Sequence, residues 1–132
     1  MASGFTTALR NLILTAEFKT DTIYGACCDA DPGDAGSTAS EIAATWSYER
    51  TEITCGDNAS SGSIANTAAL EFPAASGGDW GTVSHLAIAT TDVEADGKFS
   101  ASGSLTASKQ IEDGDQLVFA IGNITISIAA QA

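Results

Sequence analysis

His85 is the only histidine of the chain and therefore the only imidazole available as a general base. No recognisable motif places a serine or cysteine nucleophile beside it, and no Gly-x-Ser-x-Gly turn is present. The sequence also has no phosphate-binding loop and no dinucleotide fingerprint. Paired carboxylates for glycoside hydrolysis would have to come from turns such as Glu112-Asp113, and no pair stands out. We therefore expect no enzymatic activity and assign no catalytic residue.

Two acidic loops raise the possibility of a calcium site. The loop of residues 29–34 carries three aspartates, but Gly33 occupies a position where an EF-hand needs a ligand. The loop of residues 92–97 fits the first half of such a site and lacks the bidentate acid at its far end. Because Asp and Gly favour turns for backbone reasons, ordinary turn chemistry explains both loops. We expect no metal ion and no cofactor.

The three cysteines are Cys27, Cys28 and Cys55. They contain no Cys-x-x-Cys pair, and a single histidine cannot complete a zinc site with this spacing. An odd number of cysteines without a visible secretory signal favours reduced thiols over a disulfide framework. A bridge from Cys27 or Cys28 to Cys55 remains open if their two strands pair.

Three aromatic residues form a further candidate binding site. Trp46, Tyr48 and Trp80 could together offer an exposed platform for a sugar, as in a receptor-binding module. Single aromatic residues at strand positions are more often core or subunit-interface residues. The sequence alone leaves both interpretations open.

The charge of the chain excludes several classes of partner. Seventeen acidic residues face five basic ones, for a net charge of −12. Nucleic-acid binding needs clustered Lys and Arg, and an anionic membrane surface would repel this chain. No apolar run approaches the length of a transmembrane helix or of a signal-peptide core. We expect neither nucleic-acid nor membrane partners, and we expect the protein to be made in a cytoplasm.

The first element is a predicted amphipathic helix over residues 3–18, with Ser3 as its N-cap. Its apolar residues recur at the spacing of one helical stripe: Phe5, Leu9, Leu12, Ile13 and Ala16. Such a short helix needs a docking surface. A terminal helix usually packs on its own sheet, and docking on a partner protein is the alternative.

After residue 20 the pattern changes to short runs of alternating apolar and β-branched residues between turns rich in Gly, Asp and Pro. The predicted strands cover residues 22–28, 45–55, 68–72, 83–91, 98–108, 117–121 and 124–128. No strand–helix–strand rhythm indicates an α/β fold. We predict an all-β protein, an antiparallel, jelly-roll-like β-sandwich of about seven or eight strands. Residues 1–20 would form the N-terminal helix or arm and residues 21–132 the sandwich domain.

Several segments in this order resemble a family of small phage structural proteins commonly labelled phage tail fiber protein. The most specific are Ala30–Gly36, followed by Glu41, and Phe72-Pro73 with Trp80–His85. The further matching segments are Leu9–Ile13, Ile23–Ala26, Tyr48–Arg50, Leu70–Glu71, Gly103–Thr106, Ser108-Lys109 and Gly114-Asp115. The sequence departs from the family pattern at Cys27-Cys28 and at Ala43–Thr45.

The resemblance implies a virion component without enzymatic activity, bound to the major capsid protein or to other virion proteins. Our first hypothesis is a capsid decoration (cement) protein, a homotrimer on the outer capsid surface that bridges capsid subunits. The second is a tail fibre or tail-tip module that recognises a host glycan. The expected partner contacts are the helix stripe Phe5, Leu9, Leu12 and Ile13, and secondarily Asp31 and Pro32 of the acidic loop.

Overall fold

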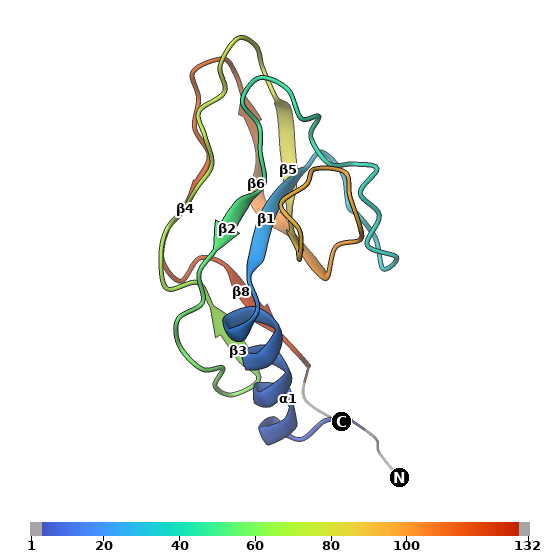
Figure 1. Ribbon diagram of the computed structural model, residues 1–132, viewed down its shortest axis with the longest axis vertical. Coiled ribbons are helices and arrows are strands. Elements are labelled where there is room, and N and C mark those ends of the chain that lie inside the picture. The colour runs from blue at the N-terminus through green and yellow to red at the C-terminus, as the bar shows by residue number, and fades with distance from the viewer. Residues whose placement is uncertain (1–3, 130–132) are drawn as a thin grey trace. The chain divides into compact units, whose positions relative to one another are not determined.

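Residues 4–129 are described by the computed structural model (Figure 1). Their contacts group them into two units. The helical unit combines residues 4–22 with Ile53–Leu70 and residues 119–129. The sheet unit combines Ile23–Glu52 with Glu71–Val118. The first junction, at Thr22–Ile23, lies next to the predicted boundary between helix and sandwich. The helical unit additionally contains two segments from later in the chain.

One short helix precedes eight strands within the described residues. The elements are α1 (Thr7–Leu14), η1 (Thr15–Thr20), β1 (Ile23–Cys28), β2 (Thr51–Ile53), β3 (Ser63–Ala65), β4 (Leu70–Glu71), β5 (Gly81–Ala89), β6 (Ala101–Ile111), β7 (Val118–Phe119) and β8 (Thr125–Ser127). They form a four-stranded sheet in the order β2-β1-β5-β6 and two-stranded sheets β3-β8 and β4-β7. The β1–β5, β5–β6 and β3–β8 pairs are antiparallel. This arrangement confirms the all-β prediction and is consistent with a β-sandwich.

The helix starts later than predicted. Thr6 is its N-cap, because its hydroxyl accepts a hydrogen bond from the Leu9 amide at 3.3 Å. Ser3, the predicted N-cap, lies outside the described residues. After Leu14 the helix widens into the π-helical segment η1, which ends at Asp21 in extended backbone. Across residues 4–129, no helix has the length and apolar character needed to cross a membrane.

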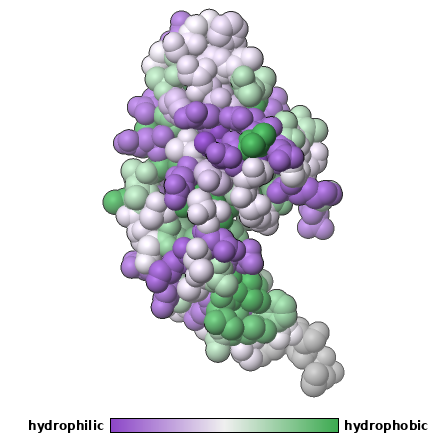
Figure 2. All heavy atoms as spheres, viewed as in Figure 1, coloured by the Kyte–Doolittle hydropathy of each residue, from purple (hydrophilic) through white to green (hydrophobic). Residues whose placement is uncertain are grey.

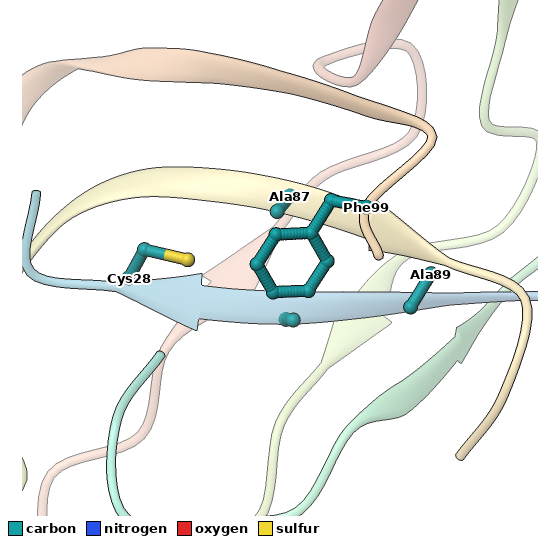
Figure 3. Packing of buried hydrophobic residues seen from close by; sticks show 5 residues of the cluster. Cys28, Ala87, Ala89 and Phe99 are labelled. Carbon is teal, nitrogen blue, oxygen red and sulfur yellow. The ribbon is translucent and has the colours of Figure 1, made fainter. Parts of the chain in front are cut away.

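One core cluster of the sheet unit is built mostly from small side chains. Phe99 lies over the small residues of β1 and β5 (Figure 3), which are Ala26, Cys28, Ala87 and Ala89. All five are at most 8% exposed. Because these neighbours are small, the ring can approach the sheet closely and fill the space above it. The richness in alanine that the sequence shows on these strands therefore has a packing role.

The prediction of a strand over residues 45–55 is largely wrong. Only Thr51–Ile53 is a strand, and Trp46 and Ser47 occupy the left-handed region with φ of 55° and 68°. The alternating pattern is overridden by tertiary hydrogen bonds, since the Trp46 carbonyl accepts from the Ser76 amide and from the Trp80 indole, each at 3.0 Å. Strand β3 was not predicted, because Ser63–Ala65 lacks the run of β-branched residues that marks a strand.

Candidate functional site

The clearest candidate interaction surface is an exposed apolar face formed by Leu9 and Leu12 of α1 together with Phe5, which precedes the N-cap Thr6; we call it the α1 face. These side chains are 48%, 41% and 66% exposed. Figure 2 shows the corresponding hydrophobic patch over α1. Ile13, the fourth predicted contact residue, is half-buried. Exposed apolar patches of this kind mark binding surfaces, because leaving several large apolar side chains in water is unfavourable. Three of the four predicted contact residues are thus exposed, as contact with a partner requires.

The opposite face of the helix is anchored within the helical unit. Leu14 and Phe18 are buried there, and so is Arg10, which is 8% exposed. The Arg10 guanidinium donates to the Ile128 carbonyl at 2.9 Å and to the Thr7 hydroxyl at 2.8 Å. These contacts fix the rotation of the helix about its axis. As a result, the α1 face points away from the residues that hold the helix.

Gly62 is the residue that makes room for Arg10. A side chain at this position would overlap the guanidinium, and its φ of +75° independently favours glycine. The Gly62 amide also donates to the Asn11 side chain at 2.8 Å. Arg10 of the helix therefore occupies the space beside Gly62, and this contact holds the helix against the loop that contains Gly62. Sequence reasoning missed both residues, because a charged residue within a helix is normally expected in solvent.

The acidic loop that contains Asp31 and Pro32 borders a shallow cleft. Its volume is about 330 Å³, and its lining comprises Asp31, Gly33, Asp34, Gly36 and residues 99–102. Asp31 is exposed and accepts a hydrogen bond from the Gly33 amide at 2.8 Å, while Pro32 is buried. This is the predicted turn chemistry. Among residues 4–129, no group of three or more His, Cys, Asp or Glu is arranged to hold a metal ion.

A buried polar cluster holds the second acidic loop in place. Arg50 and Glu41 form an ion pair at 2.8 Å whose side chains are 0% and 2% exposed. Arg50 also donates to the Thr91 and Asp96 carbonyls, at 3.0 Å and 3.2 Å. Glu41 accepts from the Ala95 amide at 2.8 Å. The backbone of the loop over residues 91–97 is therefore directed toward this pair.

Tyr48 completes the polar cluster. Its hydroxyl donates to Glu41 at 2.8 Å and accepts from the Cys27 amide at 3.0 Å. Burial acts to raise the pKa of the Glu41 carboxyl, but the hydrogen bonds it accepts, above all from Arg50, leave that pKa below its usual value. The guanidinium also lies over the Phe99 ring, 5.3 Å from its centroid. Glu41, Tyr48 and Arg50 thus all have hydrogen-bond partners, and the role of the cluster is to stabilise the fold.

The three predicted platform aromatics do not lie on one surface. Tyr48 and Trp80 are 4% and 7% exposed. They pack edge to face, with ring centroids 5.2 Å apart. Trp46 is 48% exposed and is the member of the set that reaches solvent. Its φ, like that of Ser47, is positive, and each such non-glycine residue costs of order 1–3 kcal/mol.

His85 and the cysteines show no arrangement suited to catalysis. The Ser84 hydroxyl lies 2.8 Å from His85 Nδ1, a contact between chain neighbours on β5 that motif reasoning did not anticipate. Within residues 4–129, no hydrogen bond joins the other ring nitrogen to a carboxylate, as a catalytic triad requires. Cys27, Cys28 and Cys55 are buried free thiols. Burial raises the pKa of Cys28 to about 11.

The chain is thus β-rich, and its anchored helix exposes an apolar face. A family model described as podophage GP4 fiber I protein gp80 matches residues 4–127 of the chain. Because this match covers nearly the whole sequence, the chain belongs to that family. It is therefore a fibre-type structural protein of the phage virion. Comparison with curated proteins gave no match.

Proposed function

We propose that the chain is a non-catalytic component of the phage tail fibre apparatus and that it is attached to the virion through the α1 face. The single observation that carries this proposal is the exposure of Phe5, Leu9 and Leu12 on a helix whose other face is anchored by Arg10. The family description, which names a fiber protein, supports the tail. Partners are other virion proteins, and no nucleic acid or membrane is involved.

The surface chemistry supports a protein partner. Residues 4–16 contain no carboxylate, although the whole chain has 17 acidic residues. The guanidinium of Arg10, the one charged group in this stretch, is bonded on the anchored side. The α1 face therefore presents apolar atoms without a charge that would have to be desolvated on binding.

Capsid decoration remains the competing function, since an apolar helix face suits a capsid protein as well. Copy number separates the two. Quantitative mass spectrometry of purified particles gives the ratio of this chain to the major capsid protein. We expect a ratio of a few per cent or less, as for a tail component. A ratio approaching one would identify a capsid coat protein and overturn the tail assignment.

A matched pair of variants tests the attachment surface in the same particles. Leu12→Glu places a charge on the α1 face at its most exposed residue, which is 66% exposed, and we expect the chain to be lost from virions. Val93→Glu introduces the same charge at another exposed apolar residue, in the sheet unit, where Val93 is 54% exposed. We expect this control to be incorporated normally. Equal incorporation of both variants would contradict attachment through α1.

A further inference from the structure

The longest of the eight strands, β6, lies at an open edge of its sheet. In the order β2-β1-β5-β6 it has a neighbour on one side only. Along the whole strand, Ile111 at its end is the one buried residue. Among residues 4–129, no backbone hydrogen bond joins residues 101–110 to a segment other than β5. One row of backbone N–H and C=O groups along β6 can therefore pair with another strand.

The pairing between β6 and β5 is also incomplete in the middle of β6. Residues 105–108 lie opposite the single β5 residue Ser84, because the register shifts between the pairs on either side. This bulge leaves backbone groups of residues 105–108 outside the ladder with β5. The part of β6 with the most unpaired backbone therefore includes the midpoint of the strand, Thr106.

The edge is free of negative charge. Residues 98–111 contain no carboxylate, although the chain has 17 acidic residues and a net charge of −12. Residues 101–108 are mainly Ala, Ser, Gly and Thr, which allow another backbone to approach closely. Two copies of the chain can therefore bring their β6 edges together without opposing carboxylates.

The two ends of β6 differ in charge. Its first two residues line the cleft that also contains the exposed carboxylates of Asp31 and Asp34. Lys109 is exposed near the other end of the strand. An antiparallel pair of β6 strands would place the positive end of each copy against the negative end of the other, whereas a parallel pair would place like charges together. The edge is thus complementary to a second copy of itself.

We propose that two copies of the chain form a dimer by antiparallel pairing of their β6 edges, centred on Thr106. The two four-stranded sheets become one continuous sheet, and residues 105–108 of each copy pair with those of the other. Lys109 of each copy lies opposite Gly103 of the other, beside the cleft with Asp31 and Asp34. Because the contact uses each β6 edge once, assembly stops at two copies. The dimer goes beyond the proposed fibre role and does not involve the α1 face.

Disulfide crosslinking tests this contact. The three native cysteines are buried, so a cysteine introduced at an exposed position is the one that reacts. We expect Thr106→Cys to form a covalent dimer when it is oxidised with diamide, because the two introduced thiols face each other across the two-fold axis. Thr20→Cys is the matched control, since Thr20 is an exposed threonine of the helical unit. We expect it to form little covalent dimer.

Analytical ultracentrifugation gives a second readout, which depends on the charges. We expect the wild type to contain dimer at about 100 µM. Lys109→Glu should weaken the dimer about tenfold or more, and adding Asp34→Lys should restore it, because the two charges are then exchanged. Leu12→Glu, on the α1 face, should dimerise as the wild type does. Circular dichroism verifies that each variant is folded.

Three results would overturn the proposal. The first is a wild type that is monomeric at this concentration, or trimeric, as the family resemblance implied. The second is equal crosslinking of Thr106→Cys and Thr20→Cys, and the third is failure of Asp34→Lys to restore the Lys109→Glu dimer. None of these results bears on the copy number in virions or on the incorporation of Leu12→Glu. This inference and the proposed function therefore fail separately.

Discussion

Replacing Glu41 by Gln should strongly destabilise the sheet unit. The substitution keeps the shape of the side chain but removes the charge that faces Arg50, whose side chain is 0% exposed. Removing one partner of a buried ion pair costs about 3–5 kcal/mol, because the other charge is left uncompensated. The free energy of unfolding of small domains is about 5–15 kcal/mol, so the variant should still fold but with a much smaller free energy of unfolding. At about 4 °C per kcal/mol, the melting temperature should fall by roughly 10–20 °C.

Urea unfolding followed by tryptophan fluorescence is the appropriate assay, since both tryptophans lie in the sheet unit. Glu49→Gln is the matched control, because it makes the same chemical change at an exposed residue and should cost less than about 0.5 kcal/mol. Adding Arg50→Met to Glu41→Gln should recover part of the loss, since the uncompensated charge is then removed. If Glu41→Gln lowered the free energy of unfolding by less than about 1 kcal/mol, the Arg50–Glu41 pair could not be desolvated, contrary to this prediction.

Three further predictions concern the titration of Glu41, the space at Gly62 and the accessibility of the cysteines. Because the folded pKa of Glu41 is lowered, its contribution to stability is present above the unfolded value of about 4.3 and is lost as the pH falls through the folded pKa. The stability difference between wild type and Glu41→Gln, measured by urea unfolding, should therefore shrink below about pH 4. Gly62→Ala should lower stability by about 1–3 kcal/mol more than Gly33→Ala, since both have positive φ but only the former displaces Arg10; thermal unfolding compares the two. Burial and the raised pKa of Cys28 predict that a thiol reagent at pH 8 leaves the native chain unlabelled and labels three thiols after unfolding.

Much of the sheet could be predicted because its local patterns agree with its tertiary environment. Strands β1, β4, β7 and β8 fall within the predicted runs, and β5 begins two residues before its predicted run. The loop of residues 94–97 lies in the connection between β5 and β6. Gly97 has a φ of +68°, the turn conformation that glycine favours. In these places propensity, alternation and turn chemistry indicate the same structure.

The sites were harder to predict, because their geometry depends on contacts between distant segments. Nothing in the helix pattern distinguishes an exposed stripe from a buried one, and the decisive contact joins Arg10 to the Ile128 carbonyl, 118 positions away. Similarly, alternation placed Trp46 on a strand, whereas hydrogen bonds from Ser76 and Trp80 form a turn there.

The polar cluster shows which signal was available. Glu41 and the segment Tyr48–Arg50 are part of the family pattern, and the structure joins them in one buried network. The pattern indicated that these residues matter, while their pairing became visible only in three dimensions.

Direct localisation in the particle tests the central claim, that this chain is a tail fibre component of the virion. The measurement is electron microscopy of purified phage carrying a terminal peptide tag on the chain, labelled with gold. We expect label at the tail and none over the capsid shell. Label distributed over the shell would contradict it and identify a capsid decoration protein instead.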